Sequence, residues 1–328
     1  MVLKKGNTFD LLSLYSSLKK DLKKIDQALL DIVISEESPI IEAAAHQLLG
    51  AGGKRIRPIF VLICARLGDI DKEAAMKLAL SVELIHSASI LHDDVVDDSD
   101  VRRGRTSVKA MWDNHVAMYA GDYLFAKSLT SVATLNNPLI HDVLSQTTYE
   151  LSLGEIEQIR YQYDSTQSLR VYLRRIKRKT AVLIAASCQL GAIAGGMEDK
   201  AKRLYLFGYY VGMSFQIRDD ILDYTMTEAE IGKPVGGDLQ QGNITLPAFI
   251  AMEDPVLKRQ IEKINEKTTS SEMVDVLEAI RTSGALEKAQ NISEKYLQKA
   301  VAVLDEFNDP KATKPLRQIT NYLLDRAD

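Results

Sequence analysis

The chain has 328 residues, of which 46% are hydrophobic and 26% charged, and its formal net charge is −4. These values are close to those of globular proteins and exclude a collagen, an intrinsically disordered chain and a multi-span membrane protein. A mildly acidic chain also lacks the basic character of a duplex-DNA-binding protein, so we expect no nucleic-acid partner.

Long segments of the chain have apolar residues at the 3.6-residue period of a helix. The clearest are residues 77–94, 144–159 and 205–224, and no segment alternates like a strand. Breaks are expected at residues 35–39, 50–53, 135–138, 164–168 and 227–243, the last of which is the longest irregular stretch and a candidate substrate loop. The pattern predicts one all-α domain over residues 1–328.

The uncharged stretch from Ala181 to Met197 follows a basic run and superficially resembles a membrane span. It is shorter than the ~20 residues that a span needs, and we therefore interpret it as a buried core helix. The two cysteines, Cys64 and Cys188, lie in apolar stretches and are interpreted as buried thiols. The N-terminus has no apolar core long enough for a signal peptide, so we expect a cytoplasmic protein with at most peripheral membrane contact.

Two aspartate-rich motifs carry the chemistry of the sequence. The first, His92-Asp93-Asp94-Val95-Val96-Asp97-Asp98, ends an apolar helical pattern. If it is helical, Asp93 and Asp97 share one face, as do Asp94 and Asp98.

The second motif, Asp219-Asp220-Ile221-Leu222-Asp223, repeats the spacing on another apolar helix, where Asp219 and Asp223 share a face. Hard carboxylate oxygens favour Mg²⁺, which completes its coordination with water and phosphate oxygens. Two such motifs predict a clamp for a metal-bridged phosphate group.

Cationic and polar residues occur where a phosphate ligand requires them. Lys54 and Arg57 follow a glycine turn at an expected helix start, where the backbone favours anions. Arginine offers phosphate a planar pair of donors. The other candidates are Arg102, Arg103, Lys179, Thr180, Gln216 and Lys233.

With these motifs, the sequence resembles the trans-polyprenyl diphosphate synthase family. GGKRIRP, IHSASILHDDVVDDSDVRRG, RKTA, FQIRDDILDY and GKPVGGDLQQGNITLP occur in the family's order between residues 52 and 247. Within the family the chain is most similar to the catalytic component-two subunits of heptaprenyl diphosphate synthases. The resemblance implies an isoprenoid-synthase-type helical bundle around a deep central cavity.

The implied reaction is the Mg²⁺-dependent elongation of an allylic diphosphate, such as farnesyl or geranyl diphosphate, by isopentenyl diphosphate in the trans configuration. The resemblance implies two to three Mg²⁺ ions per site, held by Asp93, Asp94, Asp97, Asp219, Asp220 and Asp223. It implies an allylic diphosphate site made by Arg102, Lys179 and Lys233. It implies an isopentenyl diphosphate site made by Lys54, Arg57, His86 and Arg103. Lys179, Thr180 and Gln216 are the implied catalytic residues, with Thr180 and Gln216 stabilising the allylic cation.

The same resemblance places the floor of the product cavity at Ala88 and Ser89, one turn above the first motif. Small side chains there predict a product of about 30 to 35 carbons, which would feed quinone side-chain synthesis. Many family members have lysine where this chain has Asn243, and this departure puts one cationic diphosphate contact in doubt.

Three other functions are compatible with parts of the sequence. Glu83-x-x-His86 supplies half of a di-iron carboxylate signature, but no other histidine has a glutamate three residues before it. A non-catalytic synthase subunit would have lost aspartates from these motifs, and a terpene cyclase usually keeps only one complete motif, whereas both motifs are complete here. The resemblance leaves open a homodimer or a heteromer with a small regulatory subunit.

Overall fold

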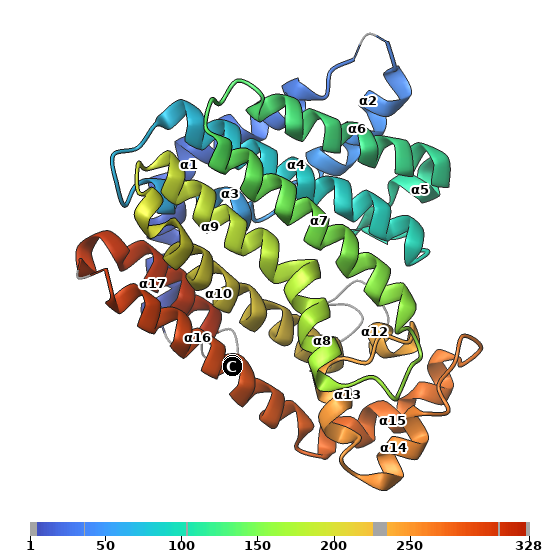
Figure 1. Ribbon diagram of the computed structural model, residues 1–328. Coiled ribbons are helices and arrows are strands. Elements are labelled where there is room, and N and C mark those ends of the chain that lie inside the picture. The colour runs from blue at the N-terminus through green and yellow to red at the C-terminus, as the bar shows by residue number, and fades with distance from the viewer. Residues whose placement is uncertain (1–4, 36, 103, 226–234, 308, 326–328) are drawn as a thin grey trace.

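A computed structural model of the chain describes residues 5–35, 37–102, 104–225, 235–307 and 309–325. Most of these residues are helical, which confirms the all-α prediction (Figure 1). The only strands among them are β1 (Val101–Arg102) and β2 (Arg105–Thr106), which form one antiparallel hairpin and are two residues long each. Strands of that length are too short to produce an alternating pattern in the sequence.

The first half of the chain forms the helices α1 (Lys5–Ile32), α2 (Pro39–Gly50), α3 (Ile56–Ala65), α4 (Lys72–Val96), α5 (Val108–Met111), α6 (Asn114–Val132) and α7 (Pro138–Arg160). The next segment is a continuous helical run made of α8 (Leu169–Ile176), the π-helical turn η1 (Lys177–Ala181) and α9 (Val182–Ala194). The remaining helices are α10 (Glu198–Thr225), α12 (Gly237–Gln240), α13 (Leu246–Ala251), α14 (Pro255–Ile261), α15 (Ser270–Thr282), α16 (Ala285–Asp305) and α17 (Pro310–Asp325).

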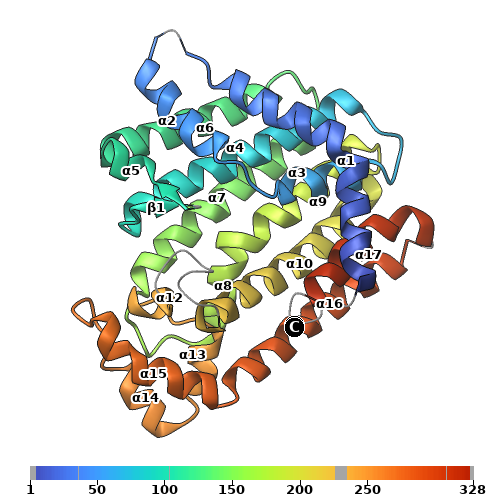
Figure 2. The ribbon, with the colours of Figure 1, turned by 180° about the vertical axis from the view of Figure 1, so that it is seen from behind.

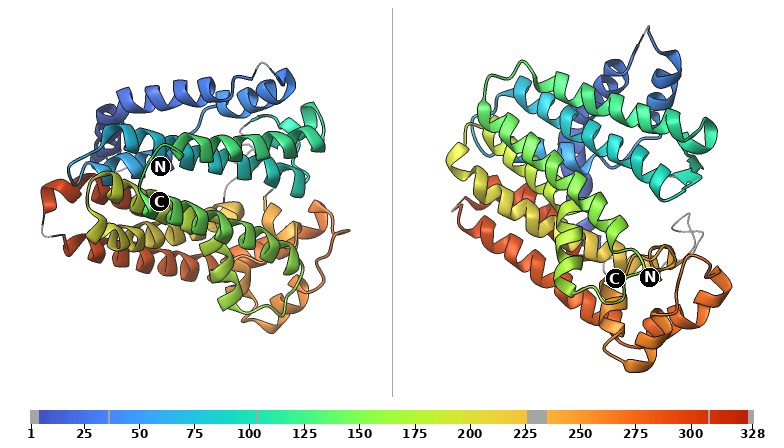
Figure 3. Two further views of the ribbon diagram at one scale, coloured as in Figure 1. Left: turned by 45° about the horizontal axis from the view of Figure 1, so that its top comes forward. Right: turned by 45° about the vertical axis from the view of Figure 1, so that its right-hand side comes forward.

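The long helices form a bundle whose centre is α3, α4, α9 and α10. Helix α4 packs against α6 and α9, and α10 packs against α9 and α16. Helix α1 lies beside α17 on the side shown in Figure 2. The short helices α12 to α15 gather at one end of the bundle, as the two views of Figure 3 show. The carboxyl-terminal ends of α4 and α10 reach this same end, where residues of both helices and of α12 line one cavity.

Local sequence signals set the starts of the long helices. The Asp71 carboxylate accepts a hydrogen bond from the Ala74 N–H at 3.0 Å and caps α4. Asn137 caps α7 in the same way, with Pro138 in the first helical turn. These side chains satisfy backbone N–H groups that no helical partner reaches. The three periodic segments predicted from the sequence lie within α4, α7 and α10.

Helix α9 is apolar on all sides and lies in the core, which confirms the interpretation of its uncharged sequence. Its close approach to α10 depends on glycine: a Cβ at Gly208 of α10 would lie 2.7 Å from the Cα of Ala185 in α9. Both cysteines are buried and free. Of the described helices, α4 alone is long and apolar enough to cross a membrane, but 72% of its apolar window is buried inside the protein.

Candidate active site

The first acidic motif lies at the C-terminal end of α4. Asp93 is in the last turn, and Asp97 caps the helix with its N–H bonded to the Asp93 carbonyl at 2.8 Å. Both side chains line one cavity at this end of the bundle. The predicted common face of Asp93 and Asp97 is confirmed.

The other two aspartates of this motif diverge from each other. Helix α4 ends at Val96, and Asp98 has a left-handed φ of 49° and pairs with Lys109. The prediction that Asp94 and Asp98 share a helical face is therefore wrong, because the helix ends before Asp98. Asp94 is 1% exposed and accepts a hydrogen bond from Arg102 Nε at 2.6 Å.

The second acidic motif lies on the last turns of α10. Asp219, Asp220 and Asp223 all line the same cavity as the first motif. Asp223 Oδ2 accepts a hydrogen bond from the backbone N–H of Asp238 at 3.2 Å, and this contact ties α10 to α12. The two motifs therefore meet across one cavity, although 121 residues separate Asp98 from Asp219 along the chain.

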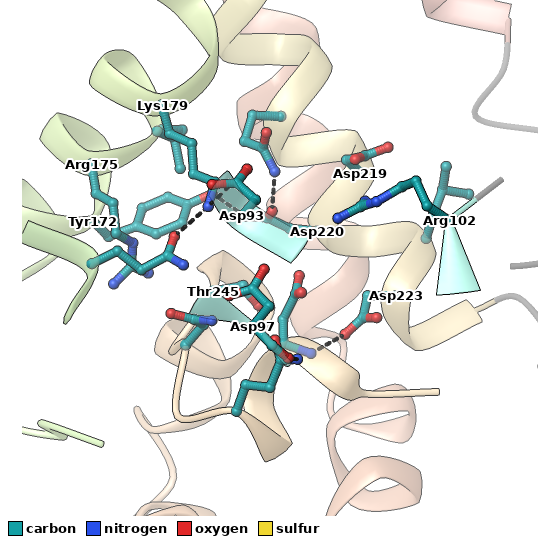
Figure 4. A pocket seen from close by; sticks show the side chains of 17 residues that line it. Asp93, Asp97, Arg102, Tyr172, Arg175, Lys179, Asp219, Asp220, Asp223 and Thr245 are labelled. Atoms are coloured by element: carbon teal, nitrogen blue, oxygen red, sulfur yellow. Dashed lines mark hydrogen bonds and ion pairs between the residues drawn. The ribbon is translucent and has the colours of Figure 1, made fainter. Parts of the chain in front are cut away.

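The cavity has a volume of about 420 Å³ (Figure 4). Its lining includes six carboxylates, those of Asp93, Asp97, Asp219, Asp220, Asp223 and Asp238. The cations in the lining are Arg102, Arg175 and Lys179, and its other members are Gln158, Tyr172, Ile176, Gln216, Leu222, Gln241, Asn243 and Thr245. Acidic groups outnumber cations, so a metal cation is the expected counter-ion. Within the described part of the chain, no three ligating side chains form a ready metal site.

Lys179 is the cation most closely surrounded by acidic groups. Its Nζ lies 3.7 Å from Asp93 Oδ2 and 3.4 Å from Glu155 Oε2, and it donates to Gln158 Oε1 at 2.9 Å. Burial lowers the pKa of Lys179, but the Asp93 and Glu155 charges outweigh it and raise the pKa, so the side chain is cationic. Burial raises the pKa of Glu155 to about 7, although Lys179 opposes the shift.

A π-helical turn carries Lys179 and Thr180. The Val182 N–H bonds to the Lys177 carbonyl five residues earlier, where an α-helix would use a carbonyl four residues earlier. Both residues lie inside the continuous helical run from α8 to α9. Turns of this type are frequent at functional sites because they rotate side chains out of the regular helical register.

A chain of hydrogen bonds surrounds Asp220. The Thr180 hydroxyl donates to Gln216 Oε1 at 2.5 Å, and Gln216 Nε2 donates to Asp220 Oδ1 at 2.8 Å. The Tyr172 hydroxyl donates to Asp220 Oδ2 at 2.6 Å. Burial, with a smaller contribution from Asp238, raises the pKa of Asp220 to about 7 despite both donors.

The residues expected to bind isopentenyl diphosphate lie outside the lining of this cavity. Lys54 is exposed, while Arg57 and His86 are half-buried. Arg103 of this set and Lys233 of the allylic set lie outside the described residues.

The residues expected to form the product floor do not line the cavity either. Ala88 is buried and Ser89 is half-buried on α4. Their role in product length stays a prediction.

The structure adds cavity residues that sequence reasoning missed. Tyr172 and Arg175 lie on α8, the latter in the basic run that precedes the uncharged stretch, and both are buried; Arg175 Nη2 donates to the Ile244 carbonyl at 2.7 Å. Asp238 lies in the candidate substrate loop, where no motif in the sequence marks it as a cavity residue. A signal for Tyr172 exists in its position two turns before Lys179, whereas nothing local marks its contact with Asp220.

Comparison with known proteins identifies the family to which the chain belongs. A family model described as "Polyprenyl synthetase" matches residues 38–282. The chain belongs to the polyprenyl synthetase family. It is therefore a prenyltransferase. This membership argues against a di-iron carboxylate protein, and so does the ion pair that Glu83 forms with Arg55 in this structure.

Several relatives are similar over nearly the whole chain. Heptaprenyl diphosphate synthase component 2 of Geobacillus stearothermophilus is 52% identical over 95% of this chain and 97% of its own length. The protein of the same name from Bacillus subtilis is 51% identical, covering 94% of this chain and 89% of its own length.

Solved polyprenyl synthases have the same fold. The crystal structure of heptaprenyl diphosphate synthase from Staphylococcus aureus is 37% identical with a TM-score of 0.89, over 93% of this chain and 97% of that one. A polyprenyl synthase from Caulobacter crescentus, complexed with calcium and isoprenyl diphosphate, is 32% identical with a TM-score of 0.90, over 95% and 96% of the two chains.

Proposed function

We propose that this prenyltransferase elongates an allylic diphosphate with isopentenyl diphosphate in a Mg²⁺-dependent reaction that produces trans double bonds. The observation that carries the proposal is the meeting of both aspartate motifs at one cavity, which Lys179 and Arg102 also line. A diphosphate held there would contact these two cations directly and would also bind the metal ions that the carboxylates hold.

The acidic side chains of the cavity fit Mg²⁺. Asp93 and Asp97 line one side, and Asp219 and Asp223 line the other. Mg²⁺ typically binds through one or two carboxylates together with water and substrate phosphate oxygens, so a pair of carboxylates on each side meets its requirement. Bound Mg²⁺ supplies Lewis-acid stabilisation of the negative charge on the diphosphate leaving group. We propose two to three ions per site.

The protein's own residues neutralise and orient the leaving diphosphate. Lys179 is cationic and lies beside Asp93, so it is placed to contact a diphosphate bound at the first motif. Arg102 is held by Asp94 at the cavity wall, with its side chain about one-third exposed. Preorganised cations of this kind stabilise charge that develops on the leaving group.

Gln216, which lines the cavity, and Thr180, which donates a hydrogen bond to it, suit the allylic half of the substrate. As the diphosphate leaves, positive charge develops on the allylic carbon, and the double bond of isopentenyl diphosphate attacks that carbon. We assign Thr180 and Gln216 to stabilising this charge, because both carry oxygen dipoles beside Lys179 and are anchored through Asp220. The proton lost in the final step passes to the released pyrophosphate.

The product is proposed to have a medium to long chain of about 30 to 35 carbons. The small side chains of Ala88 and Ser89 on α4 support this assignment, as do relatives named heptaprenyl diphosphate synthases. The name "component 2" of those relatives supports a further proposal, that this chain works with a small partner subunit.

The proposal is tested by incubating the purified chain with Mg²⁺, isopentenyl diphosphate and farnesyl diphosphate, with and without the small subunit. We expect prenyl diphosphates of about 30 to 35 carbons by chromatography of the dephosphorylated products. Release of pyrophosphate without elongation, in the presence of the partner, would instead identify a cyclase. Chelation of the metal should abolish product formation in both arms.

A further inference from the structure

The glutamate of the Glu83-x-x-His86 signature is ion-paired with an arginine, Arg55. Glu83 is 2% exposed and does not line the cavity of the aspartate motifs. Its Oε1 accepts a hydrogen bond from Arg55 Nη1 at 2.8 Å, and both side chains are at most 5% exposed. Glu83 and Arg55 thus form a buried ion pair between α4 and the start of α3.

Arg55 uses the rest of its guanidinium to connect two more helices. Its Nε donates to Asp26 Oδ1 of α1 at 2.8 Å, and its Nη2 donates to the Leu49 carbonyl in the last turn of α2 at 3.1 Å. A planar guanidinium holds its partners in a fixed arrangement, which a flexible ammonium would not do. One side chain therefore fixes the turn between α2 and α3 relative to α1 and α4.

The backbone of this turn needs such a restraint. Arg55 has a left-handed φ of 48° and Gly52 has a φ of 76°. A left-handed conformation is unfavourable for a residue with a Cβ and persists where its surroundings over-determine it. The Arg55 carbonyl then accepts the Ile59 N–H at 3.0 Å and begins α3.

The ion pair lies among all three described residues expected to bind isopentenyl diphosphate. Lys54 directly precedes Arg55, and Arg57 follows it by two residues. His86 lies one helical turn after Glu83 on α4. The exposed Lys54 and the half-buried Arg57 therefore flank a residue whose own side chain points into the core.

We propose that Arg55 and Glu83 are positioning residues for isopentenyl diphosphate. Their buried ion pair sets the GGKRIRP turn against α4, so that the cations of the turn and His86 act on one diphosphate. This inference rests on the proposed function, because it takes isopentenyl diphosphate as the second substrate.

Stability alone does not account for a buried ion pair at this place. Removing two charges from water is costly, and well-packed apolar replacements of both partners are often neutral or stabilising. Loss of one partner leaves the other charge buried and uncompensated. A positioning role therefore predicts that stability and substrate binding separate when both partners are replaced together.

The test compares Arg55→Met, Glu83→Leu and the double variant with the wild-type chain, with the small subunit supplied. We expect each single variant to lower Tm and to raise KM for isopentenyl diphosphate about tenfold, with KM for farnesyl diphosphate changed less than twofold. In the double variant Tm should recover, whereas KM for isopentenyl diphosphate should stay raised. Calorimetric titration with isopentenyl diphosphate should show the same weakened binding without turnover.

A matched control is Leu316→Ala in α17, a fully buried side chain that does not line the cavity of the aspartate motifs. It should lower Tm and leave both KM values unchanged. The inference is overturned if the double variant recovers binding together with Tm, or if both KM values rise equally. A wild-type chain that does not elongate at all would overturn the proposed function, whereas normal elongation with unchanged KM in the variants would overturn this inference alone.

Discussion

The two aspartate motifs have the same spacing but opposite surroundings. In the first, the inner residue Asp94 is paired with the cation of Arg102, and Lys179 approaches Asp93. In the second, the inner residue Asp220 accepts hydrogen bonds from two neutral donors, Tyr172 and Gln216. Identical sequence spacing thus produces one side of the cavity neutralised by cations and another held by neutral groups.

Within each motif, burial distinguishes the inner aspartate from the outer one. Asp94 and Asp220 are almost fully buried and hold other side chains of the site in place. Asp93 and Asp219 are more accessible and line the cavity. We therefore expect substitution of outer residues to affect the reaction most, and substitution of inner residues to affect stability as well.

The largest expected effect is on the outer aspartates. Asp93→Asn and Asp219→Asn should each lower kcat by about a thousandfold, because several kcal/mol of charge stabilisation are lost and each ~1.4 kcal/mol is tenfold in rate. Steady-state assays over a range of Mg²⁺ concentrations measure the effect. The control Asp142→Asn changes an exposed residue of α7 and should behave like wild type.

The second largest expected effect is on product length, which should depend on the side of the cavity that carries the first motif. One turn before the first motif the side chains are small, at Ala88 and Ser89, whereas the residue one turn before the second motif is Phe215. Ser89→Phe and Ala88→Phe should shorten the main product by one or more isoprene units, as measured by chromatography. Ser89 is half-buried and the gentler change, since a phenylalanine at buried Ala88 risks overpacking. An unaltered product distribution in both variants contradicts the proposed floor.

The inner aspartates should differ from each other in their effects on stability and on substrate. Asp94→Asn should cost about 1–2 kcal/mol, because Arg102 is partly solvated and water screens the lost charge. It should also raise KM for the allylic substrate. Asp220→Asn should cost about 1–3 kcal/mol, because one of its two hydrogen-bond donors, the buried Tyr172 or the half-buried Gln216, loses its acceptor.

Asp220→Asn should also act mainly on kcat, because Gln216 loses its anchor. Urea unfolding and separate KM and kcat measurements test both expectations. Indistinguishable kinetic changes in the two variants would remove the contrast between cation-paired and neutral-donor surroundings.

The smallest expected effect concerns pH. Burial raises the pKa of Glu155 from its usual value near 4.5 to about 7, so the folded protein keeps this proton to a higher pH than the unfolded chain. The resulting stability is fully present below about pH 4.5 and is lost as the pH rises through about 7. The fall in Tm of the metal-free protein between pH 5 and pH 8 should therefore be smaller in Glu155→Gln, by about 2 °C. Equal falls in the variant and the wild type would contradict the assignment.

The sequence alone determined the all-α fold class and the outer aspartates of the site. Apolar periodicity placed α4, α7 and α10, because a helix that buries one face repeats that face every 3.6 residues. The i,i+4 spacing predicted the common face of Asp93 and Asp97, because neighbours on a helix are fixed by local geometry. The ordered motifs predicted the family, which the comparisons confirmed.

Only the tertiary structure decided which groups meet across helices. Tyr172 and Asp220 are 48 residues apart, and Arg55 and Glu83 are 28 apart, so no local pattern links either pair. The end of α4 at Val96 turned Asp98 away from Asp94, and the π-helical turn changed the register at Lys179. Hydrogen bonds within a helix follow from spacing along the chain, whereas contacts between helices depend on how their apolar faces pack, which spacing does not specify.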